Sequence, residues 1–451
     1  MDTRLPIEFT DRMGVQLGES YDDFIRSYEQ PAYRALRLNR QKVLPVDDAL
    51  MCRIATGSDT CEAVGGVDGA YRYTEGSPGK SPLHAAGAYY IQEPSAMYPV
   101  TLLDIDEDVH KVLDLCAAPG GKTTQIADKM RGRGLLVANE VIPSRAKILS
   151  GNIERMGIEN ALVINEDPEV LSERFPLYFD RILVDAPCSG EGMFRKNPEA
   201  VDQWSPDNVK MCAKRQDFLL DCAVSMLSVG GRIVYSTCTF SPEEDEECVD
   251  RFLMRHPEFT VCAGPKKLYP HDFRGEGQFM VAFARAGGSP VPAVSPVPNS
   301  QVPGRAEYTL LCEFLAETLR KDCAIANTIR NEKDRLAGFG DSLYLLPEIC
   351  PDLKGIKVLR AGLKIGTYKR GRFEPDHALS HALKKDDAKI VIDLDPQGKE
   401  ALQYLSGMTV SCDASVKGIC LVCAAGIPLG WGKAVGGIVK NHYPKGLRIL
   451  S

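Results

Sequence analysis

Residues 112–123 read VLDLCAAPGGKT, a short apolar run that ends abruptly in a glycine-rich turn, and a helical pattern opens at Thr124. A buried strand followed by a flexible turn and a helix start is typical of a ligand-binding loop, because free backbone N–H groups and small residues let a ligand lie against the sheet edge. The stretch therefore predicts a nucleotide-type pocket in an α/β fold. The alternative is a strand–turn–helix joint that holds no ligand.

The residues of this loop discriminate between three kinds of pocket. A phosphate-binding P-loop needs a glycine five residues before Gly121, and Cys116 occupies that position. A dinucleotide loop needs a Gly-x-Gly-x-x-Gly pattern, which the pair Gly120-Gly121 does not provide. A third kind fits, because Asp114 ends the first strand, where it can take up an amino-bearing ligand, and Glu140 ends the next, where a carboxylate would hold a ribose diol. This arrangement favours S-adenosylmethionine over a nucleoside triphosphate.

Length and composition set the broad class of protein. A chain of 451 residues is too long for one core, so we expect two to four domains. It has no apolar run long enough to span a membrane and no secretory pattern at Met1. Fifteen scattered cysteines predict free thiols in a reducing compartment, and thus a cytoplasmic protein. With a net charge of −7, a nucleic acid would have to be met by local basic surface.

Apolar strands alternate with helical patterns between residues 112 and 285, which predicts a parallel, doubly wound sheet. The predicted strands are residues 112–116, 135–140, 161–165, 181–186 and 232–236. Helices are predicted to begin at Ser205-Pro206 and at Ser241-Pro242, the second with Glu244 completing a capping box. Residues 287–304 are rich in proline and almost free of charge, which indicates a semi-rigid linker.

Basic residues gather in three places. Arg34, Arg37 and Arg40 recur at three-residue spacing at the end of a predicted helical stretch, where they could contact phosphate or only face solvent. Residues 307–335 are helical in pattern, and residues 354–372 then carry seven Lys or Arg without an acid. No acid follows Asp413, and short β-type segments there suggest a small terminal module. The C-terminal half is therefore expected to bind a polyanion, with a solvated surface as the alternative.

Two cysteines follow neighbouring predicted strands. Cys188 lies in the stretch 185–190 (DAPCSG), and Cys238 lies in the stretch 236–239 (STCT). Because reacting groups gather at the carboxyl ends of parallel strands, we expect both thiols in one crevice near the loop at 116–122. A methyl donor beside two thiols indicates methylation of carbon 5 of cytosine, in which a thiolate adds to carbon 6 and is later expelled. Asp185 is placed to hold the pyrimidine edge. Either cysteine could be the one that attacks.

Two other patterns have metal-ligand spacing. Cys420 and Cys423 lie in a continuous apolar run without a second pair, which favours a buried strand. His377 and His381 are one helical turn apart, but Ala378 stands where a metalloprotease motif needs Glu, so we expect a pair on a helix surface. No metal site is predicted.

Six stretches together resemble the Nop/Sun family of RNA cytosine-5 methyltransferases, and the chain's length and C-terminal modules are most similar to the bacterial branch that acts on small-subunit rRNA. The stretches are residues 84–97 (HAAGAYYIQEPSAM), 116–123 (CAAPGGKT), 140–145 (EVIPSR), 185–196 (DAPCSGEGMFRK), 236–239 (STCT) and 275–279 (GEGQF). The tail at 440–450 (KNHYPKGLRIL) is similar to that branch's PUA-like RNA-binding module.

This resemblance implies a fold and a set of domains. A Rossmann-like class I methyltransferase domain would span residues 105–286, after an N-terminal α+β domain at 1–104 through which RNA approaches. The proline-rich linker at 287–304 would lead to two small RNA-binding modules, a first C-terminal domain at 305–395 and a β-rich PUA-like domain at 396–451.

The resemblance also implies residue roles. Cys238 would be the nucleophile and Cys188 would assist product release, with Asp185 on the cytosine edge and Lys122 supporting it. The S-adenosylmethionine site would comprise Cys116, Ala117, Ala118, Pro119, Gly120, Gly121, Lys122, Glu140, Arg145, Asp167 and Asp185. Asp245 departs from the pattern, because the family usually shows Asn there.

The expected function is methylation of a specific cytosine in 16S rRNA by a monomer that needs neither metal nor membrane. Transfer RNA is the alternative substrate, since the motifs serve both. An RNA-binding assembly factor is the alternative class, but binding alone would require neither Cys188 nor Cys238. An ATP-binding protein is disfavoured by Cys116.

Overall fold

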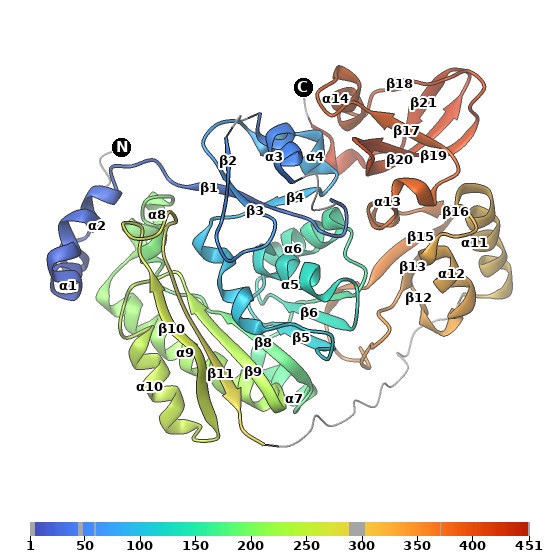
Figure 1. Ribbon diagram of the computed structural model, residues 1–451. Coiled ribbons are helices and arrows are strands. Elements are labelled where there is room, and N and C mark those ends of the chain that lie inside the picture. Colours follow the sequence, from blue (N-terminus) through green and yellow to red (C-terminus); the bar gives the residue numbers. More distant parts are fainter. Residues whose placement is uncertain (1–4, 44–47, 58–59, 288–302, 370, 450–451) are drawn as a thin grey trace.

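The computed structural model describes residues 5–43, 48–57, 60–287, 303–369 and 371–449 (Figure 1). Its central element is an eight-stranded sheet with the order β10-β11-β9-β8-β5-β6-β7-β14. Strands β5 to β9 run parallel, which confirms the predicted doubly wound sheet, and each of the other three pairs antiparallel with its neighbour. The strands are β5 (Lys111–Asp114), β6 (Leu135–Asn139), β7 (Ala161–Ile164), β8 (Phe179–Asp185), β9 (Leu227–Thr237), β10 (Phe259–Leu268), β11 (Gln278–Arg285) and β14 (Val358–Ala361).

Helices cover both faces of this sheet (Figure 1). On one face, α5 (Gly121–Met130) and α6 (Pro143–Met156) pack against alternate strand residues such as Val112 and Leu136. On the other face, the core side chains come from α7 (Pro168–Arg174), α9 (Pro206–Met226) and α10 (Glu246–Arg255). Burial on both faces explains why these strands read as continuous apolar runs.

The two predicted helix starts have different outcomes. Helix α9 begins at Pro206 as predicted, with the Ser205 hydroxyl accepting a hydrogen bond from the Asn208 N–H. Helix α10 begins at Glu246 and not at Pro242. The predicted capping box does not form, because the Glu244 carboxylate turns away to accept from the Ser189 N–H. The short helix α8 (Pro198–Gln203) precedes α9.

The N-terminal part carries a four-stranded antiparallel sheet with the order β2-β3-β1-β4. Its strands are β1 (Arg34–Leu38), β2 (Cys61–Ala63), β3 (Ala70–Tyr73) and β4 (Tyr89–Ile91), and its helices are α1 (Ile7–Leu17), α2 (Tyr21–Ser27), α3 (Asp48–Thr56) and α4 (Pro82–Ala85). The predicted helical face of Arg34, Arg37 and Arg40 is therefore wrong. Those residues form or follow a strand, whose backbone is satisfied by β3 and β4.

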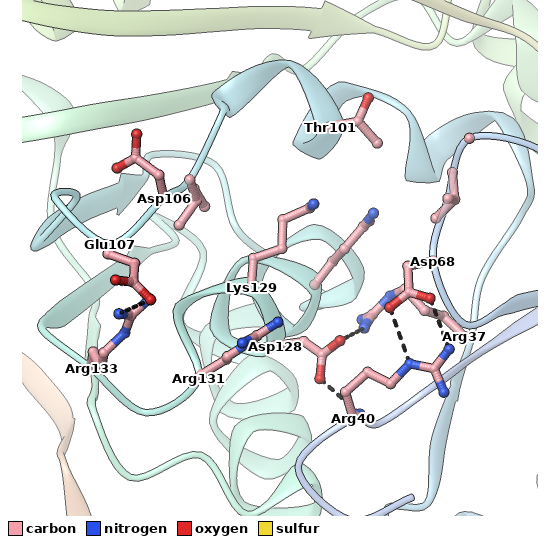
Figure 2. A pocket seen from close by; sticks show the side chains of 14 residues that line it. Arg37, Arg40, Asp68, Thr101, Asp106, Glu107, Asp128, Lys129, Arg131 and Arg133 are labelled. Carbon is pink, nitrogen blue, oxygen red and sulfur yellow. Dashed lines mark hydrogen bonds and ion pairs between the residues drawn. The ribbon is translucent and has the colours of Figure 1, made fainter. Parts of the chain in front are cut away.

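Two of these arginines, Arg37 and Arg40, are engaged by other side chains, whereas Arg34 is exposed. Arg37 is buried and donates to the Thr124 hydroxyl at 2.8 Å, with Asp128 at 3.9 Å. Arg40 forms ion pairs with Asp48 and Asp68. Figure 2 shows Arg37 directed toward Asp128 and Arg40 toward Asp68, at the rim of a cavity of about 360 Å³ beside the C-terminal end of α5. They hold the N-terminal part against the central sheet.

One pair of cysteines corrects the prediction of free thiols throughout. Cys52 on α3 and Cys61 on β2 form a disulfide, with their Cα atoms 6.4 Å apart. The pairing depends on the tertiary approach of two elements, which the spacing of scattered cysteines does not reveal. The other thirteen cysteines are free.

The C-terminal part contains two further sheets. The first has the order β12-β13-β15-β16 and is formed by β12 (Leu336–Phe339), β13 (Ser342–Leu345), β15 (Leu363–Lys369) and β16 (Arg372–Pro375). The stretch predicted as helical at 307–335 forms two helices, α11 (Arg305–Thr318) and α12 (Ala324–Asn331). The chain breaks between them where Leu319 pairs with Ala388. Strand β14 leaves this part and extends the central sheet beside β7.

The last sheet confirms the β-rich terminal module. Its order is β17-β19-β20-β21-β18, with β17 (Val391–Leu394), β18 (Val410–Ser411), β19 (Gly418–Ala424), β20 (Ile427–Val435), β21 (Ile438–Asn441) and helix α14 (Lys399–Leu405). Cys420 and Cys423 lie on β19 and are buried, as predicted. His377 and His381 lie on α13 (His377–Ala382), but the prediction of a surface pair is wrong, because α13 packs against α6 and β20 and buries His381.

The basic stretch at 354–372 is mostly neutralised by local acids. Arg360 pairs with Glu154 on α6, and Lys357 pairs with Glu166 after β7. Lys364, Lys369 and Arg372 pair with acids of their own module. This stretch therefore attaches the first C-terminal module to the central sheet. By contrast, no ion pair in the described part of the chain involves Lys417, Lys433, Lys440, Lys445 or Arg448.

The predicted linker at 287–304 falls largely on residues 288–302, which lie outside the described residues. The exact domain boundaries stay a prediction. Among the described residues, no helix has the length and apolar character needed to cross a membrane.

Candidate active site

The loop between β5 and α5 is shaped by its glycines. Gly120 has φ +113°, a left-handed conformation that favours glycine. A Cβ on Gly121 would lie 3.3 Å from the side chains of Gln92 and Tyr90, so this position also demands a small residue. The turn exists because the chain must reverse from a buried strand into α5 within seven residues, 114 to 121.

Helix α6 supports this loop from outside. Arg145 donates to the Ala118 carbonyl at 2.9 Å, and Asn152 donates to the Pro119 carbonyl at 2.8 Å. These two hydrogen bonds fix consecutive carbonyls of the turn, so the loop is preorganised before any ligand arrives.

A cavity of about 230 Å³ opens between this loop and the N-terminal part. One wall comes from the predicted cofactor residues Cys116, Ala117, Ala118, Pro119, Gly121, Lys122 and Asp185, together with Asp114. The facing wall comes from Tyr90, Ile91, Gln92, Glu93 and Ala96. Sequence reasoning gave this second wall no role, although its residues lie in the quoted stretch 84–97.

Of the acidic residues predicted for the cofactor, Asp114 and Asp185 line the cavity, whereas Glu140 and Asp167 do not. Asp114 is fully buried, accepts a hydrogen bond from the Thr123 hydroxyl at 2.7 Å, and burial raises its pKa to about 7. Its Oδ1 atom has no hydrogen-bond partner among the described residues. Glu140 is buried at the end of β6, where it pairs with Arg145 and accepts from the Ile142 N–H. Asp167 is exposed and caps α7 through the Glu169 N–H.

Lys122 and Asp185 form the centre of the site. The Lys122 ammonium lies 2.7 Å from Asp185 Oδ2, while Asp185 Oδ1 accepts from the Ser236 hydroxyl at 2.7 Å. Although burial alone would lower it, the pKa of Lys122 is raised because the Asp185 carboxylate stabilises its charged form, with a smaller contribution from Cys238. Gln278 on β11 lies 3.5 Å from Asp185 Oδ1 and is a further neighbour that sequence reasoning missed.

The two predicted thiols meet at the ends of β8 and β9. Cys188 Sγ and Cys238 Sγ are 3.2 Å apart, and the Cys238 N–H donates to Cys188 Sγ at 3.3 Å. The hydrogen bond with Cys238 and burial together raise the pKa of Cys188 well above that of a free thiol. The protonated form of Cys188 is therefore favoured. A thiolate at Cys238 would lie near the Lys122 ammonium.

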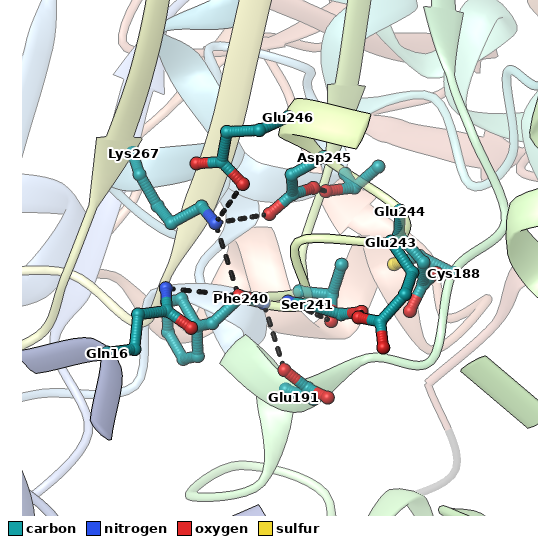
Figure 3. Close-up of polar contacts among 12 residues, drawn as sticks. Gln16, Cys188, Glu191, Phe240, Ser241, Glu243, Glu244, Asp245, Glu246 and Lys267 are labelled. Carbon is teal, nitrogen blue, oxygen red and sulfur yellow. Dashed lines mark hydrogen bonds and ion pairs between the residues drawn. The ribbon is translucent and has the colours of Figure 1, made fainter. Parts of the chain in front are cut away.

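The chain after Cys238 is held by buried polar contacts (Figure 3). The Glu191 carboxylate accepts from the Phe240 N–H at 3.1 Å. Lys267 donates to the Phe240 carbonyl at 3.1 Å and forms an ion pair with Asp245 at 2.9 Å. Asp245 in turn accepts from the Thr237 hydroxyl at 2.6 Å, and burial raises its pKa well above the usual range. The acid at position 245 is thus compensated by Lys267.

A second buried acid lies behind Cys188. Glu244 accepts from the Ser189 N–H at 3.0 Å and from Gln216 at 2.8 Å, while its Oε1 atom has no hydrogen-bond partner in the described structure. Burial raises the pKa of Glu244 to about 7. Sequence reasoning used Glu244 only as a helix cap and did not place it here.

Four family models match the chain in consecutive segments. They are described as the N-terminal domain of 16S rRNA methyltransferase RsmF (residues 5–94), 16S rRNA methyltransferase RsmB/F (100–282), the RsmF rRNA methyltransferase first C-terminal domain (313–383) and the methyltransferase RsmF PUA domain (391–449).

Whole-chain relatives agree with these models. The ribosomal RNA small subunit methyltransferase F of Vibrio vulnificus (strain YJ016) is 31% identical, over 98% of this chain and 97% of its own length. The same-named protein of Escherichia coli (strain SE11) is 32% identical, over 95% of this chain and 93% of its own. The chain belongs to the RsmF family. This confirms the predicted resemblance and the Rossmann-like methyltransferase fold with its PUA-like C-terminal module.

A solved structure supports the same fold for the RsmF-family core. A methyltransferase homologue from Pyrococcus horikoshii is 27% identical to this chain with a TM-score of 0.56, and the match covers 63% of this chain and 96% of the homologue. The shared part is therefore less than the whole chain.

Proposed function

We propose that the chain transfers a methyl group from S-adenosylmethionine to carbon 5 of a specific cytosine in 16S rRNA. Family membership supports an rRNA substrate, because the relatives that match nearly the whole chain are named small-subunit rRNA methyltransferases. The observation that carries the chemistry is the pair Cys188 and Cys238, whose sulfur atoms lie 3.2 Å apart beside the Lys122–Asp185 ion pair.

The cavity beside the loop fits S-adenosylmethionine. The unpartnered Asp114 Oδ1 suits the amino group of the methionine portion. Glu140, which follows β6 and does not line this cavity, would hold the ribose hydroxyls where the ligand extends beyond it. Small residues at 117–121 leave room for backbone to approach the ligand closely. When bound, S-adenosylmethionine supplies an electrophilic methyl group. Arg145 and Asp167 would support the site from outside.

The protein's own residues would activate the cytosine. A Cys238 thiolate adds to carbon 6, which makes carbon 5 nucleophilic, and Asp185 hydrogen-bonds the pyrimidine edge as charge develops. Lys122 keeps Asp185 oriented and lowers the cost of the thiolate. After methylation, the carbon 5 proton must leave and the Cys238–carbon 6 bond must break. Cys188 lies 3.2 Å from Cys238 and its protonated form is favoured, so it is placed to pass its proton to the departing Cys238 sulfur and to take up the carbon 5 proton in exchange, which leaves both side chains as thiols.

The proposed roles of Cys188 and Cys238 predict that replacing each cysteine has a different effect. Cys188→Ala should accumulate a covalent protein–RNA adduct, because addition through Cys238 proceeds while release stalls. Cys238→Ala should form none. The measurement is a denaturing gel of each variant incubated with S-adenosylmethionine and labelled small-subunit rRNA, with Cys262→Ala, an exposed cysteine on β10, as the matched control. Identical behaviour of the two variants would contradict the proposed roles.

A further inference from the structure

A second cavity lies where four parts of the chain meet, away from the two thiols. It encloses about 360 Å³. Its walls come from the segment around α4 (Ser81, His84), from α6 (Asn152, Glu154, Arg155), from α13 (His377, His381) and from the C-terminal tail (Tyr443, Leu447, Ile449). No function described above uses it.

The basic side chains at this cavity have no acidic partner among the described residues. Arg155 donates to the carbonyls of His84 and Tyr89 and to the Asn152 side chain, and no described carboxylate pairs with it. Behind it, Lys42 contacts the Ala86 carbonyl and His381 Nδ1, again without a described acid. An arginine without a carboxylate partner in a half-buried pocket is a ready anion site.

The histidines point to the same conclusion. His377 Nε2 and His381 Nε2 are 3.0 Å apart, so one donates to the other, while His377 Nδ1 has no hydrogen-bond partner among the described residues. Burial, followed by the charge of Arg155, lowers the pKa of His84 to about 4, and burial likewise lowers that of His377 to about 4. Burial therefore favours the neutral form of these histidines, and an anion in the cavity would let them take up protons.

The described carboxylates near the cavity are paired with other residues and do not act as that anion. Glu154 is the one carboxylate among the described residues of its wall, and Arg360 pairs with it. Asp376, which precedes α13, pairs with Lys364 and caps the helix. We propose that this cavity binds a phosphate group of the RNA substrate, held by Arg155, His84 and His377, a step that rests on the proposed function for its ligand. The apolar part of the wall, Ile148 and Ile449 included, suits the adjoining sugar or base.

The position of the cavity also connects it to the cofactor loop. Arg155 Nη2 donates to Asn152 Oδ1 at 3.2 Å, and Asn152 Nδ2 donates to the Pro119 carbonyl at 2.8 Å. A phosphate on Arg155 thus lies two hydrogen bonds from the turn that holds S-adenosylmethionine. Linkage requires that, if RNA in this cavity tightens cofactor binding, the cofactor tightens RNA binding by the same factor.

Titration of the histidines tests the proposal without relying on methyl transfer. The full chain has seven histidines, of which His110 and His256 lie outside the cavity and serve as internal references. With isotope-labelled histidine, NMR titrations would be recorded with a single-stranded fragment of small-subunit rRNA and with inorganic phosphate. We expect RNA to raise the pKa of His84 and His377 and to leave His110 and His256 unchanged. RNA affinity should then increase as the pH falls toward 4, the pKa of both histidines in the free chain, and level off below it.

Variants give a second readout. Arg155→Gln should weaken RNA binding about tenfold and lower the salt dependence by about one counterion. His377→Gln should weaken it less and remove most of the pH dependence. Arg255→Gln on α10, which removes the same charge from an exposed ion pair, is the matched control and should change little.

Three outcomes would overturn the proposal. The first is that neither His84 nor His377 responds to either probe. The second is a response to inorganic phosphate but not to RNA, which would indicate a small phosphorylated ligand. The third is an equal loss of RNA affinity in Arg155→Gln and Arg255→Gln. These experiments measure RNA binding and histidine titration and not methyl transfer, so failure of the phosphate site can be distinguished from failure of the proposed function. A chain that methylates rRNA normally while these histidines stay silent refutes only the phosphate site.

Discussion

At the scale of single residues, burial assigns different tasks to chemically similar side chains. Cys116 and Cys188 are both free thiols whose pKa is raised, Cys116 mainly by burial and Cys188 mainly by its contact with Cys238. Only Cys238 combines a partner thiol with a nearby ammonium, Lys122. The sequence predicted these cysteines as site residues, but their protonation depends on neighbours brought together by the fold.

Glu244 provides a pH-dependent prediction at this scale. Its pKa is raised by burial from 4.5 to about 7, so the folded chain holds a proton that the unfolded chain releases. Its contribution to stability is fully present below pH 4.5 and is lost as the pH rises through 7. Glu244→Gln removes this loss. We expect the variant to gain roughly 2 kcal/mol in unfolding free energy relative to the natural chain between pH 5 and pH 8.

Urea unfolding at the two pH values measures this difference, and comparison with the natural chain cancels other titrating groups. Glu243→Gln, a neighbour whose pKa is lowered despite partial burial because the Ser241 hydroxyl donates to it, serves as the control and should not show the same gain. A constant difference between Glu244→Gln and the natural chain across the pH range would show that Glu244 titrates normally.

At the scale of elements, the sequence predicted what local patterns encode. Strands β5 to β9 and helix α9 appeared as expected, because apolar runs and a Ser-Pro start are local signals. Residues 34–38, expected at the end of a helical stretch, form strand β1, because pairing with β3 and β4 outweighed spacing. The Cys52–Cys61 disulfide and the buried state of His381 were missed for the same reason. Contacts between distant elements leave no periodic trace in a single sequence.

Strand β14 is the clearest such case. It extends the central sheet beside β7, and Arg360 on it forms an ion pair with Glu154 on α6 in which the arginine is only 6% exposed. Removing one partner of a buried pair leaves an uncompensated charge, which typically costs about 3 kcal/mol. We expect Arg360→Met to lose stability by about that amount, as measured by urea unfolding of the full chain.

The matched control for this pair is Arg372→Met. Arg372 also pairs with an acid, Glu374, but its side chain is 71% exposed, so the loss should stay below about 1 kcal/mol. Equal losses in the two variants would mean that β14 is attached by its backbone alone and that the Arg360–Glu154 pair adds nothing.

At the scale of the whole molecule, three regions outside the central sheet contribute to sites on or near it. The N-terminal part supplies one wall of the cofactor cavity through Tyr90, Gln92 and Glu93. The C-terminal modules complete the cavity around Arg155 through His377 and Tyr443. The sequence predicted RNA contact from basic stretches, but those at Arg37 and at 354–372 are largely neutralised by acids. Charge counted along a chain does not show which cations remain free.

The central claim is that the intact chain methylates one cytosine of small-subunit rRNA. The most direct measurement is methyl transfer from labelled S-adenosylmethionine to assembled small subunits, naked small-subunit rRNA and bulk tRNA in parallel, followed by bisulfite mapping. We predict label at a single cytosine of the rRNA, absent with Cys238→Ala. Label on tRNA would keep the mechanism and contradict the substrate, and no label on any of the three would contradict the claim that the chain is a methyltransferase of RNA.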